Sequence, residues 1–253
     1  MSRGRRAAAA CGALVLLVLA GCTGGAQEPA ADGAPPAAVA APSAQDAVAA
    51  AGTALVDAGS ARVDVELDSV TGPVRASGPA RFTPFAADLT VALGTRGAQV
   101  RVLDERAWVR FGGSDRWQPL STGLVPVGAV GGMLHAAPGL RDVVAAPGTT
   151  DVDGVAATTY TGSVDLAAAR AGAPDPAVGT RLDELAGLVS PTPRFTAWLG
   201  APDAAPADRG RLLRLRLEPQ APATGTQAAG AAVPGAVTVS FADPGVPVEI
   251  TAP

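Results

Sequence analysis

Apolar and polar side chains alternate in several separate stretches of the chain. In residues 61–68, Val63, Val65 and Leu67 fall on one side and four charged residues fall on the other, which is the pattern of a β-strand with one face in water. The same alternation recurs in five further stretches, marked by Leu89, Val91 and Leu93, by Val100 and Val102, by Tyr160, Val164 and Leu166, by Leu213, Leu215 and Leu217, and by Val237, Val239 and Phe241. Glycine-bearing turns separate them, so the chain is predicted to build a large antiparallel sheet.

The last of these strands is expected to turn back on itself. Asp243-Pro244-Gly245 fits a type II turn, because proline presets the first central residue and glycine accepts the positive φ of the second. We therefore expect a final hairpin that closes on residues 246–250.

Three other stretches carry apolar residues at helical spacing. Residues 43–46 can cap a helix that ends at Gly59, and residues 123–146 suggest short helices joined by a bend at Pro138-Gly139. Residues 180–189 form one further amphipathic helix. Helices must cover the apolar side of the sheet, so the predicted fold is α+β: a curved antiparallel β-sheet, or half-barrel, with helices packed on its concave face.

The N-terminus has the plan of a bacterial signal peptide. Three arginines within the first six residues precede an uncharged apolar run, residues 7–20, which is shorter than the roughly 20 residues of a membrane-spanning helix. Leu19-Ala20-Gly21-Cys22 is similar to a lipobox, where bacterial lipoproteins are acylated on the cysteine and cut before it. We predict that residues 1–21 are removed and that Cys22 anchors the protein to the outer, extracytoplasmic face of the cell membrane. The simpler interpretation of Cys22 is a small residue near an ordinary secretory cleavage site.

Behind this anchor, residues 22–42 are predicted to form a flexible tether and residues 43–253 a single domain. The tether consists mostly of alanine, proline and glycine, so it buries too little apolar surface to offset the entropy of ordering. The remaining length, about 210 residues, suits one domain.

The processed chain would be acidic and without free thiols. The full chain has 19 basic and 23 acidic residues, and loss of the three N-terminal arginines would leave 16 basic residues and a net charge of −7. Such a surface disfavours nucleic acid as a partner. Cys11 lies in the discarded segment and Cys22 would carry lipid, so no cysteine remains for a disulfide, a metal site or a nucleophile.

Few residues could support catalysis. The chain has one histidine, one tyrosine and no lysine, and His135 lies in an apolar run, where a partly buried helix histidine is the simpler interpretation. A Ser-His-Asp set is not excluded, but no Gly-x-Ser-x-Gly elbow accompanies it. We therefore predict that the protein is not an enzyme and needs no cofactor.

Two groups of carboxylates are also better explained structurally. Asp151-Val152-Asp153-Gly154 resembles the start of a calcium loop, but the third ligand position and the distal glutamate are missing, so a turn before a strand is predicted. Asp183 and Glu184 are adjacent on a helix and point in different directions. They are interpreted as a solvated face, and no metal site is predicted.

Aromatic residues and arginines offer weaker candidates for ligand contacts. Trp108, Trp117 and Trp198 could line a lipid site or its rim, with core packing as the alternative. Arg211, Arg214 and Arg216 could bind an anionic head group, with a role in solubility as the simpler alternative.

Several segments together resemble the mycobacterial LppX/LprA/LprF/LprG lipoproteins. They are Val152 to Val155 leading into Thr159 to Leu166, the stretch Arg211 to Leu217, and the ending Val237 to Pro253. The resemblance implies a LolA/LppX-like half-barrel around an apolar cavity, which holds lipid or glycolipid acyl chains that the protein carries in the cell envelope, with envelope transport proteins as possible partners. It supplies no catalytic motif. The chain departs from the family pattern in long loops at residues 201–209 and 220–234 and in its few aromatic residues.

The predicted cavity lining follows from the apolar faces of these elements. The candidates are Val63, Val65, Leu67, Leu89, Val91, Leu93, Val100, Val102, Trp108, Leu134, Leu185 and Trp198. The alternative is a scaffold or protein-interaction lipoprotein, in which the same faces close into a filled core. An elongated apolar pocket of several hundred Å³ would favour the carrier, and small voids would favour the scaffold.

Overall fold

A computed structural model describes residues 42–68, 72–93, 96–103, 106–120, 128–220 and 235–253. The predicted signal peptide, Cys22 and all of the predicted tether except Pro42 lie outside these residues. The described residues belong to one compact unit, which extends from Ala41 to Pro253.

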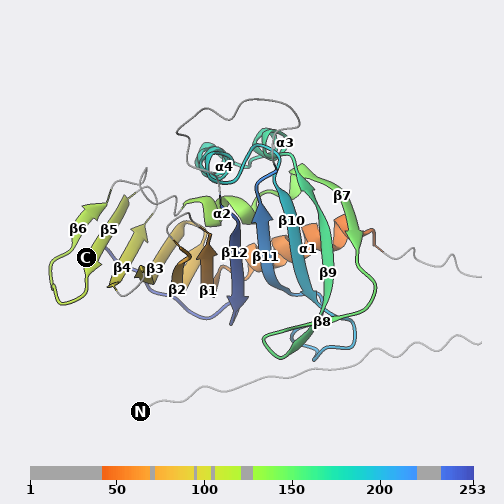
Figure 1. The fold of residues 1–253 in the computed structure, drawn as a ribbon, viewed down its shortest axis with the longest axis horizontal. Coiled ribbons are helices and arrows are strands. Elements are labelled where there is room, and N and C mark those ends of the chain that lie inside the picture. The colour runs from red at the N-terminus through yellow and green to blue at the C-terminus, as the bar shows by residue number, and fades with distance from the viewer. Residues whose placement is uncertain (1–41, 69–71, 94–95, 104–105, 121–127, 221–234) are drawn as a thin grey trace, which may run out of the picture. The chain divides into compact units, whose positions relative to one another are not determined.

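Within these ranges, 12 strands form one open antiparallel sheet (Figure 1). The strands are β1 (Ser60–Leu67), β2 (Val74–Phe82), β3 (Phe85–Leu93), β4 (Arg96–Leu103), β5 (Arg106–Phe111), β6 (Gln118–Leu120), β7 (Leu140–Ala145), β8 (Thr150–Val152), β9 (Val155–Val164), β10 (Arg194–Gly200), β11 (Leu212–Glu218) and β12 (Val237–Ala242). Their order is β6-β5-β4-β3-β2-β1-β12-β11-β10-β9-β7, and β8 pairs with β9.

The sheet has two halves that meet where the first strand pairs with the last. We call β1–β6 the first half and β7–β12 the second half. β1 and β12 run antiparallel, with Val63 opposite Phe241 and Leu67 opposite Val237. This register places the apolar side chains of both strands on the same inner face, so the two halves share one hydrophobic core.

The helices are α1 (Ala44–Asp57), α2 (Gly128–Leu134), α3 (Leu166–Ala171) and α4 (Pro176–Leu188), with a short 3₁₀ turn at Ala137–Gly139. α1 crosses the second half of the sheet, whereas α3 and α4 lie together near one end of the strands (Figure 1). The apolar sides of all four helices enter the shared core. The predicted α+β fold, a curved open sheet with helices on one face, is confirmed. No helix in the described part of the chain is long and apolar enough to cross a bilayer.

The helices predicted at residues 43–59 and 180–189 correspond to α1 and α4, and α4 begins four residues earlier than predicted. Ser43 caps α1, since its hydroxyl accepts a hydrogen bond from the Asp46 backbone N–H and the Asp46 carboxylate accepts one from the Ser43 backbone N–H. The Asp175 side chain caps α4 by accepting from the Val178 N–H, and Pro176 occupies the first turn.

Three sequence-based expectations about secondary structure are wrong. Residues 140–145 form β7 rather than a helix, because the 3₁₀ turn ends at Gly139 and the chain then pairs with β9. Leu166 begins α3 rather than ending β9, because Asp165 caps the helix through the Ala168 N–H.

The expected final hairpin is also absent. The turn at residues 243–246 forms with positive φ at Gly245, but residues 246–250 make no strand. Pro247 has no N–H to donate to a neighbouring strand. The segment is held instead by Ser60, whose Oγ donates to the Val246 carbonyl at 2.5 Å and whose own carbonyl accepts from the Gly245 N–H at 2.8 Å.

Candidate functional site

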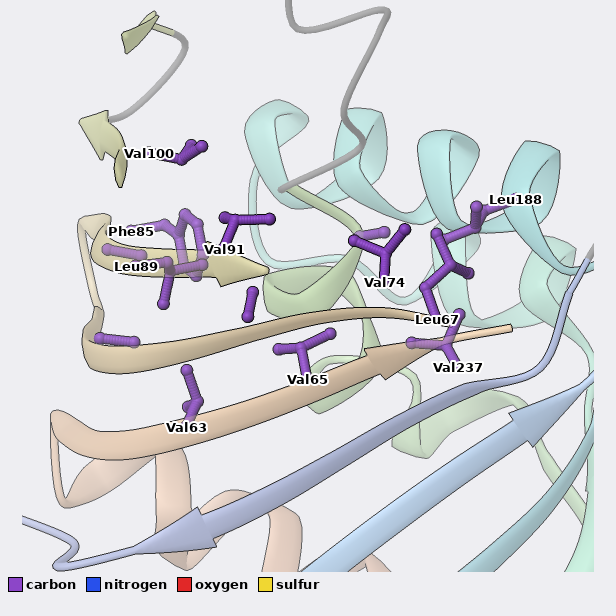
Figure 2. Close-up of a pocket in the computed structure, with 14 residues that line it drawn as sticks. Val63, Val65, Leu67, Val74, Phe85, Leu89, Val91, Val100, Leu188 and Val237 are labelled. Carbon is purple, nitrogen blue, oxygen red and sulfur yellow. The ribbon is translucent and has the colours of Figure 1, made fainter. Parts of the chain in front are cut away.

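An apolar cavity lies on the inner face of the first half of the sheet. Its walls come from β1, β2, β3, β4 and β12, and its roof from one residue each of α2 and α4 (Figure 2). All 14 lining side chains are apolar: Val63, Val65, Leu67, Val74, Ala76, Ala80, Phe85, Ala87, Leu89, Val91, Val100, Ala129, Leu188 and Val237.

Strand register and small side chains together create this space. Val65 lies opposite Ala76 on β2, and Ala76 lies opposite Val91 on β3, so the inner face of three neighbouring strands carries only short side chains at this level. Gly78 removes a side chain altogether. A Cβ there would lie 2.1 Å from the Asp88 carbonyl oxygen, so close approach of β2 and β3 requires glycine.

The cavity is buried at one end and partly exposed at the other. Val63, Phe85 and Val100 are fully buried, whereas Leu67, Val74 and Leu188 are only half-buried. In Figure 2, Leu67, Val237 and Leu188 gather at one end of the lining, and Phe85, Leu89 and Val100 lie at the other. We call this lining the groove, and its half-buried end near Leu67 on β1 and Leu188 at the end of α4 the mouth.

The enclosed volume is small. The cavity measures about 100 Å³, below the several hundred Å³ typical of a site for a drug-sized ligand. The space between the same walls reaches about 800 Å³ when the part open to solvent is included. By the volume criterion set from the sequence, the closed cavity alone does not meet the expectation for a carrier.

The two helices that cover the cavity, α2 and α4, contact other helices more extensively than they contact the strands. α4 packs chiefly on α2 and α3, and Gly132 of α2 contacts its backbone so closely that a Cβ would lie 2.7 Å from the Arg181 carbonyl oxygen. One clear link from α4 to the sheet is the Arg181 guanidinium, which lies 5.5 Å from the centre of the Phe85 ring. α4 therefore contacts α2 and α3 more extensively than the strands, although its Leu182 and Leu185 side chains are buried in the shared core.

Half of the twelve candidate lining residues meet in this cavity. The six are Val63, Val65, Leu67, Leu89, Val91 and Val100. Val102 and Leu185 are buried in the core without lining the cavity, and Leu134 lines a separate void of about 40 Å³ in the second half. Leu93 ends β3, and its side chain lies outside the described part of the structure.

The structure places the two candidate tryptophans away from the cavity. Trp108 alternates with the buried Ala107 and Val109 on β5, so its ring lies on the outer face of the sheet. Trp198 also lies on the outer face, where it packs with a small cluster that includes Val152 and Leu213. Trp117, on the approach to β6, is half-buried and lies against arginine side chains of the outer face.

Sequence reasoning missed the contribution of β2 and of the roof. β2 supplies Val74, Ala76 and Ala80 to the lining, but its alternation is carried mostly by alanine and glycine and is therefore weak. Ala129 and Leu188 enter the lining through helix packing, which has no signature in the local sequence.

The residues considered for other chemistry have structural surroundings. His135 follows α2 and is half-buried; burial, and then the charge of Arg181, lower its pKa from 6.5, while Asp175 acts in the opposite direction. Asp153 and Gly154 both adopt positive φ and form the predicted turn between β8 and β9. In the part of the chain that the structure describes, no group of three or more His, Cys, Asp or Glu side chains could hold a metal ion.

The arginine row on β11 is neutralised by its neighbours. Arg214 pairs with Asp153 at 2.9 Å, and Arg216 pairs with Glu218 at 2.9 Å and with Asp68 at 3.5 Å. Arg211 pairs with Asp208 at 3.0 Å. These pairs leave little uncompensated charge for an anionic head group.

Comparison with known proteins supports the fold. No protein-family model and no curated protein sequence matches the chain. The crystal structure of LprF from Mycobacterium bovis is similar with a TM-score of 0.54 and 17% identity, covering 83% of this chain and 96% of that one. The crystal structure of the Mycobacterium tuberculosis lipoprotein LppX is similar with a TM-score of 0.50 and 21% identity, covering 81% and 99%. The open sheet with its helical layer is thus the fold that this chain shares with LprF and LppX.

Proposed function

We propose that the chain is a lipid-anchored, non-enzymatic protein of the cell envelope that binds acyl chains of a lipid or glycolipid in the groove of the first half and carries them. One observation carries the proposal: all 14 side chains lining the cavity are apolar, and they form a continuous row from a buried end to a half-exposed mouth. Hydrocarbon tails need such a surface, because each buried methylene gains about 0.8 kcal/mol.

The anchor and the cellular place come from the N-terminal sequence. The lipobox-like Leu19-Ala20-Gly21-Cys22 supports acylation of Cys22 and attachment to the outer face of the cell membrane. The similar structure of LppX is that of a lipoprotein. We assign the chain to the LppX/LprA/LprF/LprG group on this basis, with envelope transport proteins as partners.

The small closed volume requires that the groove widens when a chain enters. We expect α4 to be the element that moves, since it packs most extensively on α2 and α3 and contributes only Leu188 to the cavity lining. Lifting α4 with α2 would separate Leu188 and Ala129 from the strands while keeping the tight contact at Gly132. The exposed apolar walls would then be covered by the ligand.

A filled-core scaffold is the second candidate, and the volume of about 100 Å³ is the observation that favours it. In that case the groove is a packing defect, and its apolar walls contact one another rather than a ligand. The two candidates differ in whether the domain takes up hydrocarbon chains.

A matched pair of substitutions tests the proposal. Ala76 lines the groove opposite Val65, and Ala92 is an exposed residue of the adjacent strand, on the opposite face of the sheet. Ala76→Trp should block the groove and lower the affinity for a fluorescent fatty acid at least tenfold, whereas Ala92→Trp should leave it unchanged. Circular dichroism and thermal unfolding of both variants establish that the sheet is intact.

Ligand carried from the cell provides an independent check. The protein purified from its own envelope should release lipid in a fixed ratio on solvent extraction, and native mass spectrometry should show the added mass. Absence of bound lipid together with no uptake of the fatty acid by the unaltered chain would exclude the carrier and leave the scaffold.

A further inference from the structure

The outer face of β4 and β5, with the segment that leads into β6, carries a cluster of arginines and aromatic rings. Antiparallel pairing sets Arg101 opposite Trp108, and Gln99 opposite Arg110. Trp117 precedes β6, which pairs with β5. We call this surface, made of Arg101, Arg106, Trp108, Arg110, Arg116 and Trp117, the Arg/Trp face.

The rings and guanidinium groups of this face are stacked on one another. The Arg101 and Arg110 guanidinium carbons lie 4.8 and 5.0 Å from the centre of the Trp117 ring, and that of Arg106 lies 5.4 Å from the centre of the Trp108 ring. Arg101 is further fixed by Asp88, with the nitrogen and oxygen 2.6 Å apart. The tryptophans are thereby held at the surface, half-buried, rather than in the core.

The charge of this region is opposite to that of the rest of the chain. Residues 96–120 contain five arginines and three carboxylates, a formal charge of +2, so the other 228 residues carry −6 of the total of −4. Among the described residues, Arg106, Arg110 and Arg116 have no carboxylate partner within salt-bridge distance. Positive charge that no described carboxylate compensates is available to an external anion.

The comparison with β11 shows that this is not a general feature of the outer face. Arg214 and Arg216 lie on the same side of the sheet, and each is paired with at least one carboxylate. The Arg/Trp face therefore differs from the arginine row that the sequence first suggested as an anion site.

A surface hollow lies at the end of this face. Phe111 ends β5 there with 50% of its surface exposed, although it lies opposite the inner-face residue Ala98. Beside it, Gln99, Arg110, Ser114 and neighbouring residues line a hollow of about 420 Å³. Half-buried tryptophan rings that stack on arginines suit the boundary between lipid head groups and hydrocarbon, where tryptophan and arginine are both favoured.

We propose that the Arg/Trp face docks the domain on the head-group layer of an anionic phospholipid bilayer. Arg106, Arg110 and Arg116 attract lipid phosphates, and Trp108 and Trp117 contact the head-group region. The docking surface lies on the opposite face of the sheet from the cavity, so it acts whether or not the cavity holds an acyl chain. On a domain tethered to the same membrane, such a surface would favour one orientation against the bilayer.

The test uses the unacylated chain from Thr23 to Pro253, which retains every described residue and removes the anchor. Its partitioning is measured by co-sedimentation at low salt with vesicles of phosphatidylcholine alone and of phosphatidylcholine mixed with phosphatidylglycerol. Binding is expected only to the mixed vesicles and should weaken as salt is added. In a Trp198→Phe background, the emission of the remaining tryptophans should shift to shorter wavelength on binding.

Two double variants with the same charge change separate the face from net charge. Arg106 and Arg116 are exposed residues of the face, and Arg62 and Arg194 are exposed arginines elsewhere on the sheet without a described carboxylate partner. Replacing Arg106 and Arg116 by glutamine should weaken partitioning about 30-fold, since each basic residue at the surface contributes about fivefold. Replacing Arg62 and Arg194 by glutamine should change it less than threefold.

Three results would overturn the proposal. They are no binding to the mixed vesicles at low salt, equal loss in the two double variants, and binding to a soluble polyanion such as heparin without any binding to vesicles. Fatty-acid uptake is measured on the same samples, so failure of docking is distinguishable from failure of the lipid carrier.

Discussion

The two halves of the sheet have the same architecture but differ in how completely their inner face is filled. In the first half, short side chains such as Ala76, Ala87 and Val91 border a cavity of about 100 Å³. In the second half, side chains larger than alanine, such as Phe195 and Leu215 of the strands and Leu134 of α2, leave a void of only about 40 Å³. One continuous sheet thus combines a hollow region and a packed region.

Helix cover accounts for part of this difference. α1 lies across the second half and buries Val48, Ala51 and Leu55 there. The cavity of the first half is covered, among the described helices, only by Ala129 and Leu188. An inner face becomes hollow where small side chains and sparse helix cover coincide, and the following predictions test that explanation.

The largest expected effect on stability comes from shortening one of the two leucines that lie opposite Val237. Leu217 of β11 and Leu67 of β1 both lie opposite Val237, but Leu217 is 2% exposed and Leu67 is half-buried at the cavity mouth. Leu217→Ala should lower the free energy of unfolding by about 3 kcal/mol, because it opens a void in a packed region. Leu67→Ala should cost about 1 kcal/mol, because its side chain is already partly in contact with solvent.

Urea unfolding followed by circular dichroism measures both variants under identical conditions. Equal losses would mean that the mouth is packed as tightly as the second half. The distinction between a hollow and a filled half would then be wrong.

Adding volume to a buried side chain should change the free energy of unfolding less, and the sign of the change should differ between the two halves. Ala197 is fully buried on β10 and borders neither void, whereas Ala87 is buried on β3 and lines the cavity. Ala197→Val should destabilise the domain by about 1–2 kcal/mol through overpacking. Ala87→Val should stabilise it by about 0.5 kcal/mol, because the added methyl groups enter existing space.

Differential scanning calorimetry of the two variants decides the sign. Both substitutions introduce the same β-branched side chain into a strand, so strand propensity cancels in the comparison. If Ala87→Val destabilised the domain as much as Ala197→Val, the cavity would be too tight to admit even a methyl group.

The sequence predicted the fold better than the site. β1, β11 and β12 alternate large apolar residues with charged or hydroxyl residues, and such strands are readable without a structure. The pattern identifies an inner face, but it does not tell whether the opposing layer fills it, because that depends on helices far away in the sequence. The pattern named six residues that the structure places in the cavity lining, whereas no local pattern indicates Ala129 or Leu188.

The tryptophans show a second limit of predicting the inner face from sequence. In Arg106-Ala107-Trp108-Val109-Arg110, the inner positions are the small Ala107 and Val109. Size and hydrophobicity favour Trp108 as the core residue, whereas alternation with respect to Val100 and Val102 on the neighbouring strand favours Ala107 and Val109. The strand pairing decides, and it was not available from one stretch of sequence.

The smallest expected effect concerns the boundary between the two halves, where His135 follows α2. Burial and Arg181 lower the pKa of His135 below 6.5, so the folded domain disfavours its protonated form. As the pH falls through 6.5, the unfolded chain takes up this proton first, and the free energy of unfolding decreases until the folded pKa is passed. His135→Gln should flatten the dependence of the urea midpoint on pH as the pH falls from neutral through 6.5. α2 supplies Ala129 to the cavity and Leu134 to the filled half. If protonation of His135 loosens the contact between α2 and α4, fatty-acid affinity should fall over the same pH range. It should then fall further in the unaltered chain than in His135→Gln. An identical pH dependence in both proteins would show that this boundary does not respond to the histidine.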